Sequence, residues 1–302
     1  MKNHIDTIKK ILPEDRIFIN ESMKKHTTFR TGGAADLFLM PENAEQLSEL
    51  IRLCRREGRE YFIIGNGSNL LVSDRGYRGI IIAVTEAFSD IEVSGNEIHA
   101  GAGALLSGIA DTARKNSLSG FEFASGIPGT AGGAMVMNAG AYGGEMKDVV
   151  KSVEALTPEG ERVNLSNSEM GFGYRKSIVK SEGLTVLKII FSLNPGNEGE
   201  IKAKMDELSA KRREKQPLEF PSAGSTFKRP EGHFAGKLIM DAGLAGFSVG
   251  GASVSEKHCG FIINRGNATS DDVYRLIKKV REVVKEGSGV LLESEVMMIG
   301  DF

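Results

Sequence analysis

The stretch Ala124-Ser-Gly-Ile-Pro-Gly-Thr-Ala-Gly-Gly-Ala-Met-Val-Met-Asn-Ala-Gly-Ala-Tyr-Gly143 contains six glycines and no charged side chain. A solvated loop normally carries polar side chains, which this segment largely lacks, and glycine weakens a core strand. Bare backbone N–H groups can approach a large ligand that is partly apolar and partly anionic. The segment therefore indicates a nucleotide cofactor site.

A second glycine-rich turn lies in Tyr61-Phe-Ile-Ile-Gly-Asn-Gly-Ser-Asn-Leu-Leu-Val72. Gly65 and Gly67 begin the dinucleotide pattern G-x-G-x-x-G, but Leu70 takes the third glycine position and a strand-like sequence follows where a helix is needed. No G-K-[ST] occurs, which excludes a P-loop. The turn is either a simple hairpin turn or, together with the segment at 124–143, part of a pyrophosphate cradle.

The 302-residue chain has the composition of a soluble globular protein, with 40% hydrophobic and 26% charged residues. A net charge of -2 and the lack of a basic stripe give no reason to expect nucleic acid as a partner. The amphipathic N-terminus, 1–12, lacks the apolar core of a secretion signal, and no apolar run is long enough to span a membrane, so we expect a cytoplasmic protein. Cys54 and Cys259 are expected to be reduced, buried or half-buried thiols.

Apolar periodicity predicts an irregular alternation of strands and helices, which places the chain in the α+β class. The clearest helix follows Asn43 and ends at Gly58, because apolar residues between them recur at the spacing of one helical face. Another is expected over 105–116. Strands are expected over 35–40, 61–64, 80–84, 91–93, 98–100, 149–156, 162–165 and 185–193.

The chain changes character after Leu193, where a polar segment rich in turn residues precedes a long charged helix to Gln216. The unit beyond is expected to contain a strand over 261–264. A helix over 271–286 should follow, with Thr269 or Ser270 as its N-cap and Gly287 as its stop. Strands over 290–292 and 296–299 are expected to close a small sheet.

Seven motifs, in order, resemble those of the UDP-N-acetylenolpyruvoylglucosamine reductase family, and the resemblance covers the chain from about residue 20 onward. They are Thr27-Thr-Phe-Arg-Thr-Gly-Gly33, Ile64-Gly-Asn-Gly-Ser-Asn-Leu-Leu71, Ser125-Gly-Ile-Pro-Gly-Thr-Ala-Gly-Gly133, Asn138-Ala-Gly-Ala-Tyr-Gly143, Tyr174-Arg175, Gly224-Ser-Thr-Phe-Lys228 and Leu292-Glu-Ser-Glu-Val296. The chain is similar to the shorter subclass, which lacks an inserted loop that covers the substrate in the longer one.

The resemblance implies a two-lobed FAD-binding domain over 1–195 of the PCMH-like type shared by flavin oxidases and reductases, with lobes of about 1–85 and 86–195. It also implies a C-terminal α/β substrate-binding domain over 200–302. FAD would be bound non-covalently and NADPH would donate the hydride. The FAD-binding residues implied are Arg30, Thr31, Gly65, Asn66, Gly67, Ser68, Asn69, Ser125, Gly126, Ile127, Pro128, Gly129, Thr130, Gly133, Asn138, Ala139 and Gly140.

The family pattern implies Arg175, Ser225 and Glu295 as catalytic residues. A guanidinium offers a planar fork for the substrate carboxylate and for the charge that develops on it. A hydroxyl held close to the enediolate, with water excluded, can protonate it. Glu295 must either be protonated and donate a hydrogen bond, or orient a partner, because an ionised carboxylate repels an anion.

The UDP-sugar substrate would be held by further polar side chains, mostly in the C-terminal domain. Those implied are Tyr142, Tyr174, Lys215, Lys228, Lys237, His258 and Asn264. The five histidines have no metal-ligand spacing, so no catalytic metal is expected. We expect a monomer without a nucleic-acid or membrane partner.

Two alternatives remain at this point. One is a flavin oxidase of the same cofactor fold, which would oxidise an alcohol or sugar with oxygen. The motifs around Ser225 and Glu295 favour the reductase over this oxidase. A non-catalytic FAD carrier or nucleotide-sugar binder is the other, and turnover with NADPH would exclude it.

Overall fold

The computed structural model describes residues 2–302, with side chains from Ile5 onward; Met1 and the first side chains of the N-terminal amphipathic pattern lie outside the described residues. Internal contacts group the chain into two compact units. Unit 1 comprises the residues up to Ile19, Leu37–Asn66 and Gly79–Lys211, and unit 2 comprises Asn20–Asp36, Gly67–Arg78 and Arg212–Phe302. The predicted domains, 1–195 and 200–302, are continuous in sequence instead, and their boundaries stay a prediction.

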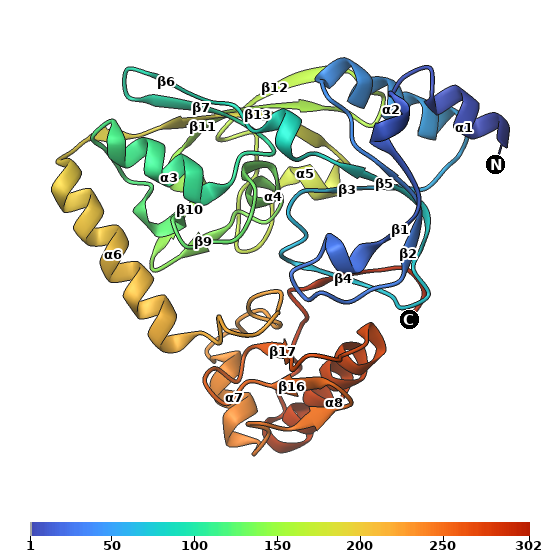
Figure 1. Ribbon diagram of the computed structural model, residues 1–302. Helices are drawn as coiled ribbons and strands as arrows, with labels where there is room; N and C mark the ends of the chain where they lie inside the picture. Colours follow the sequence, from blue (N-terminus) through green and yellow to red (C-terminus); the bar gives the residue numbers. More distant parts are fainter. Residues whose placement is uncertain (1) are drawn as a thin grey trace. The chain divides into compact units, whose positions relative to one another are not determined.

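Unit 1 contains a five-stranded antiparallel sheet (Figure 1). Its order is β12-β11-β13-β7-β6, and the predicted hairpin of β6 and β7 is confirmed. The bounds are β6 (Ile91–Ser94), β7 (Glu97–Gly101), β11 (Val150–Leu156), β12 (Arg162–Ser166) and β13 (Thr185–Ser192). Helices α3 (Leu106–Lys115) and α4 (Ala131–Val136) both pack against this sheet.

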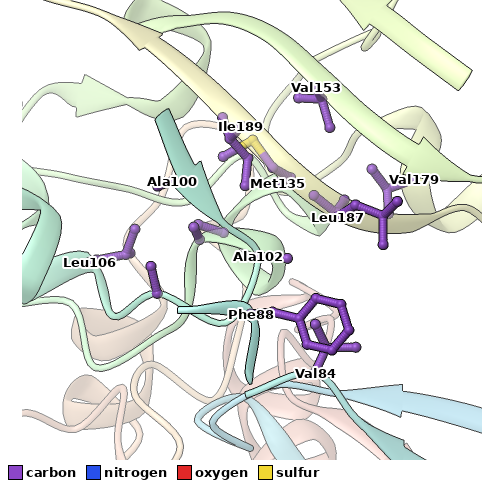
Figure 2. Packing of buried hydrophobic residues seen from close by; sticks show 14 of the residues in the cluster. Val84, Phe88, Ala100, Ala102, Leu106, Met135, Val153, Val179, Leu187 and Ile189 are labelled. Atoms are coloured by element: carbon purple, nitrogen blue, oxygen red, sulfur yellow. The ribbon is translucent and has the colours of Figure 1, made fainter. Parts of the chain in front are cut away.

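The core of unit 1 lies where α4 meets the sheet. Figure 2 shows Met135 of α4 beside Ile189 of β13, and both side chains are completely buried. Phe191 of the same strand is also fully buried and packs edge-on against Phe121, with ring centroids 4.9 Å apart. The glycine-rich segment at 124–143 is therefore anchored by a short apolar helix, which the sequence analysis did not predict.

A four-stranded sheet includes the strand β3, which leads into the glycine-rich turn at 65–69. Strands β3 (Tyr61–Ile64) and β5 (Tyr77–Ala83) pair in parallel, with Ile64 opposite Ala83. β1 (Ile17–Ser22) and β2 (Ala34–Leu39) complete the order β1-β2-β5-β3, and the unit boundaries fall inside β1, β2 and β5. The predicted helix after Asn43 is confirmed as α2 (Ala44–Arg56), because the Asn43 side chain accepts a hydrogen bond from the Gln46 backbone at 2.9 Å and caps it.

Unit 2 is built on the antiparallel strands β15 (Ser248–Val249), β16 (Ala252–Val254) and β17 (Ile262–Asn264), with α8 (Ser270–Ser288) packed on them. Thr269 is the N-cap of α8, in a capping box with Asp272. The prediction that Gly287 stops this helix is wrong. The helix continues to Ser288 and ends at Gly289, whose φ of 74° is the left-handed conformation that glycine adopts easily.

The last strand, β18 (Met297–Ile299), pairs in parallel with β4 (Leu70–Val72). The simple hairpin alternative for the turn at 65–69 is therefore wrong, because β3 pairs with β5 whereas β4 pairs with β18. Residues 290–292 form no strand, so the predicted local sheet of 290–292 with 296–299 is also wrong. A strand of three residues has too short a hydrophobic pattern to predict which distant strand it pairs with.

The remaining helices and strands are short, apart from α6. They are α1 (Lys2–Ile8), α5 (Ile178–Ser181), α6 (Glu198–Lys215), α7 (Ala235–Asp241), β8 (Leu118–Ser119), β9 (Gly140–Ala141), β10 (Gly144–Glu145) and β14 (Asn194–Pro195). Single 3-10 turns occur at Glu14–Arg16, Met23–Lys25, Glu86–Phe88, Glu122–Ala124 and Met146–Asp148. Within residues 2–302, no helix has the length and apolar character that crossing a membrane requires.

Candidate active site

In unit 1, the turn after β3 lies directly against the glycine-rich segment at 124–143. The Asn66 side-chain amide donates a hydrogen bond to the Pro128 carbonyl at 2.8 Å. A Cβ atom on Gly65 would overlap the Thr130 hydroxyl oxygen, so only glycine fits there. The sequence-predicted residues Gly65, Asn66, Pro128 and Thr130 are thus brought together.

A cavity of about 80 Å³ opens beside this contact. Its walls combine bare backbone with apolar side chains, among them Gly65, Val84, Thr130, Gly133, Val136 and Val186. Such a lining suits a ligand that has both an apolar ring and a polar backbone-binding part. The lining residues therefore fit an apolar part of FAD, although the cavity is smaller than the whole cofactor.

In unit 2, the Thr27–Gly33 motif packs against the other half of the same turn. The Thr28 N–H donates to the Gly67 carbonyl at 3.2 Å, and a Cβ on Gly67 would overlap the His26 carbonyl. Among the described residues, the buried hydroxyl oxygens of Thr28 and Thr31 have no hydrogen-bond partner. Buried hydroxyls are normally satisfied, so these two are suited to a ligand's polar groups.

The candidate catalytic Arg175 belongs to unit 1 and sits in a tight turn. Gly173 and Lys176 exchange backbone hydrogen bonds of 3.0 and 3.2 Å, which leaves Tyr174 and Arg175 as the turn. The guanidinium lies over the Tyr174 ring, 5.2 Å from its centroid, and Arg175 has a φ of 53°. A positive φ is uncommon for arginine and marks a backbone that its surroundings hold in place.

Ser225 and Glu295 both belong to unit 2 and lie on neighbouring segments. The Glu295 N–H donates to the carbonyl of Thr226 at 2.8 Å, and Phe227 and Ser294 form an isolated bridge. Thr226 is completely buried, which fixes the backbone beside Ser225. The backbone segments that carry the two predicted residues are therefore hydrogen-bonded to each other, whereas the meeting of the Ser225, Glu295 and Arg175 side chains stays a prediction.

Like Asn66, the two other predicted FAD-binding asparagines, Asn69 and Asn138, use their side chains for hydrogen bonds within the protein. The amide of Asn69 donates to the carbonyl of Glu295 at 3.1 Å. Asn138 is 1% exposed, and its amide donates to the Glu145 carboxylate and to the Gly173 carbonyl. Their role as direct FAD ligands stays a prediction.

The predicted substrate-binding residues differ in their exposure to solvent and in their ion pairs with other side chains. Tyr142 and Tyr174 are exposed, at 45% and 51%, and their contact with substrate stays a prediction. Lys215 is exposed at the end of α6, Lys228 pairs with Glu293 at 3.0 Å, and Lys237 pairs with Asp241 at 2.9 Å.

Two further predicted substrate-binding residues, His258 and Asn264, form hydrogen bonds to backbone groups of the protein. The His258 Nδ1 accepts a hydrogen bond from the Gly260 N–H at 3.1 Å, and burial lowers the pKa of this imidazole, so it is neutral at pH 7. Asn264 is 4% exposed and bonds the backbone of Phe29, Gly266 and Ala268. Substrate contact by either residue stays a prediction.

The sequence analysis missed Thr28 and Glu145. Thr28 lies inside the Thr27–Gly33 motif, but the motif alone does not predict that the Thr28 hydroxyl is buried without a hydrogen-bond partner. Glu145 is the first charged residue after the uncharged stretch that ends at Gly143, and that abrupt change was the available signal.

Comparisons with known proteins match both parts of the chain. The model of an FAD binding domain matches residues 35–166, and the model of the C-terminal domain of UDP-N-acetylenolpyruvoylglucosamine reductase matches residues 216–299. The reductase of Caldanaerobacter subterraneus is 54% identical over 98% of both chains, and that of Clostridioides difficile is 50% identical over 96% of both.

A solved structure agrees with these matches. The crystal structure of the Thermus caldophilus reductase superposes with a TM-score of 0.81 at 36% identity, over 93% of this chain and 98% of that one. The predicted α+β fold with an FAD-binding domain of the PCMH-like type is confirmed. This chain belongs to the UDP-N-acetylenolpyruvoylglucosamine reductase family.

Proposed function

We propose that this protein reduces UDP-N-acetylglucosamine enolpyruvate to UDP-N-acetylmuramate with NADPH and FAD, a step of peptidoglycan precursor synthesis. The observation that carries the proposal is the presence of an FAD binding domain and the reductase's C-terminal domain in one chain, with relatives of that name matched over nearly its whole length. We infer that residues 1–195 bind FAD and residues 200–302 bind the substrate.

When bound, FAD would supply the transfer of a hydride from NADPH to the terminal vinyl carbon of the substrate. In unit 1, the groups that would hold it are the backbone of Gly65 and the Asn66–Pro128 contact. In unit 2, the buried hydroxyls of Thr28 and Thr31 are separate candidates for contact with a ligand. Because no charged side chain lies in the segment at 124–143, binding there depends on backbone N–H groups and close packing.

The protein's own groups complete the addition across the double bond. Arg175 binds the substrate carboxylate and stabilises the charge that builds on it after hydride addition, since a guanidinium matches two carboxylate oxygens. Ser225 donates the proton that ends on the adjacent carbon, so hydride and proton together convert the vinyl group into a lactyl ether. Glu295, on the segment beside Ser225, donates a hydrogen bond or orients a partner.

The proposal also covers the residues that contact the substrate, the oligomeric state and the cellular location of the protein. We infer that Tyr142, Tyr174 and the lysines at 215, 228 and 237 contact the UDP-sugar. We also infer that the protein is a monomer in the cytoplasm, without a nucleic-acid partner, because its net charge of -2 gives no electrostatic attraction to phosphate backbones.

Absorbance of the purified protein tests the proposal. NADPH should bleach the flavin under nitrogen, and UDP-N-acetylglucosamine enolpyruvate should restore the colour at once, with UDP-N-acetylmuramate as product. Purified protein that cannot be loaded with FAD, or bleached protein that the substrate does not reoxidise, would overturn it. Rapid reoxidation by oxygen with an alcohol or sugar as the reductant would support the oxidase instead.

A further inference from the structure

The side chain of Asn138 uses every polar group it has. Its Oδ1 accepts the Lys147 N–H at 2.9 Å, and its Nδ2 donates to Glu145 Oε2 at 2.9 Å and to the Gly173 carbonyl at 3.2 Å. The residue is 1% exposed and has a φ of 44°, a left-handed conformation that asparagine tolerates better than most residues. Asn138 thus joins three backbone segments from inside unit 1.

One of those segments is the turn that carries Arg175. Gly173 opens the turn and Lys176 closes it, and a Cβ on Gly173 would collide with the Lys176 side chain. Arg175 has a φ of 53°, which costs energy and persists only where neighbouring contacts offset that cost. The bond from Asn138 to the Gly173 carbonyl is such a contact, because it fixes the peptide at the entry of the turn.

The Asn138 amide also donates a hydrogen bond to the Glu145 carboxylate, which interacts electrostatically with Arg175. Glu145 Oε2 pairs with the Lys147 ammonium at 2.9 Å, and Glu145 caps the turn at Met146–Asp148. Its pKa is lowered chiefly by the hydrogen bond from Lys147, with smaller contributions from Asn138 and the positive charge of Arg175. The guanidinium of Arg175 is therefore within electrostatic reach of Glu145.

We propose that Asn138 is a positioning residue for Arg175, which holds the Tyr174–Arg175 turn in the conformation that presents the guanidinium to the substrate carboxylate. This inference rests on the proposed function. It differs from direct FAD contact by Asn138, because both N–H groups and the oxygen of the amide are already engaged inside unit 1.

Two variants test the role without imposing backbone strain. Asn138→Asp keeps size and left-handed tolerance but replaces the donor with an acceptor that faces the Gly173 carbonyl and Glu145, and Asn138→Gly removes the side chain. Asn167→Ala is the matched control, because the Asn167 amide also donates two hydrogen bonds to backbone carbonyls of unit 1, those of Lys147 and Val150 at 2.8 and 2.7 Å, but neither bond is to the Arg175 turn.

The expected result is selective. In both Asn138 variants, FAD content and bleaching by NADPH stay near wild type, whereas reoxidation by substrate slows by about tenfold or more, the scale of a misplaced catalytic group. Calorimetry should show weaker binding of UDP-N-acetylmuramate, because its carboxylate meets the same arginine. Asn167→Ala should lower the melting temperature with normal reoxidation. Normal reoxidation in the Asn138 variants, or FAD loss with normal reoxidation of the loaded fraction, would overturn the proposal.

A double-mutant cycle with Arg175→Ala shows whether Asn138 acts through the arginine. If it does, Asn138→Gly slows reoxidation in wild type but changes it little in the Arg175→Ala background. Equal effects in both backgrounds would assign Asn138 a general structural role and overturn the inference. Wild-type protein that does not turn over with NADPH and substrate would instead overturn the proposed function, so the two failures are distinguishable.

Discussion

The side-chain amide of Asn69 donates a hydrogen bond of 3.1 Å to the backbone carbonyl of Glu295. The carbonyl of Asn69 in turn accepts the Met297 N–H at 3.0 Å, at the start of the parallel pair of β4 and β18. Both residues lie in unit 2, so the second half of the glycine-rich turn and the candidate catalytic carboxylate share one rigid backbone frame. We therefore expect a substitution at Asn69 to disturb the backbone of Glu295.

Asn69→Ala should lower the free energy of unfolding by about 0.5–1.5 kcal/mol, the usual net value of one hydrogen bond. Reoxidation by substrate should slow as well, because the backbone of Glu295 loses one of its supports. Thermal unfolding and stopped-flow absorbance measure the two effects. The control is Asn116→Ala, which removes an equivalent amide bond to the Thr112 carbonyl in unit 1 and should leave reoxidation at the wild-type rate. If Asn69→Ala lost FAD but reoxidised normally once loaded, the amide would act on the cofactor and not on Glu295.

Ser225→Ala should separate the two halves of the reaction. Bleaching by NADPH needs no proton transfer to substrate and should keep its rate, whereas reoxidation should fall by about 10² to 10⁴, the usual contribution of a positioned general acid. Stopped-flow absorbance resolves both steps. An equal slowing of both would mean that Ser225 serves the fold.

Gly67→Ala should abolish FAD binding, and Gly58→Ala should not. Both glycines have nearly the same φ, 59° and 61°, so the backbone strain of the substitution is matched. The added Cβ at Gly67 overlaps the His26 carbonyl, whereas at Gly58 it meets nothing within 4 Å. FAD content of the purified variants, measured after denaturation, gives the answer. Equal FAD content in both would show that the turn at Gly67 does not hold the cofactor.

Neither thiol should react in the folded protein. Burial raises the pKa of Cys54 to about 12 and raises that of Cys259, so the reactive thiolate is scarce at pH 8. An aromatic disulfide reagent should label the protein slowly at pH 8 and rapidly after urea is added. Fast labelling without urea would show that unit 1 or unit 2 opens locally near its cysteine.

Local sequence signals predicted most of the elements, because periodicity and caps act over a few residues. The Asn43 cap, the hairpin of β6 and β7, and the Thr269 cap all followed from neighbouring residues. The stop of α8 was misplaced because Gly287 and Gly289 offer the same local signal, and only the tertiary structure determines which one adopts a positive φ.

Long-range relationships were not predictable in this way. The pairing of β4 with β18 joins three-residue strands, and the partner of a strand is set by the whole sheet and not by its own residues. The site residues were named by family resemblance, but the internal bonds of Asn69 and Asn138 depend on distances between segments far apart in sequence. Neither propensity nor motif spacing contains those distances.

The pairing of β4 with β18 also has a consequence for protein synthesis. Asn69 and Glu295, at the start of this pair, are 226 positions apart, so a ribosome produces β4 long before its partner strand. All three β4 residues, Leu70, Leu71 and Val72, are buried apolar side chains in the finished protein. Until β18 emerges, the nascent chain exposes an apolar strand with unpaired backbone, which is the kind of segment that chaperones bind and that drives aggregation.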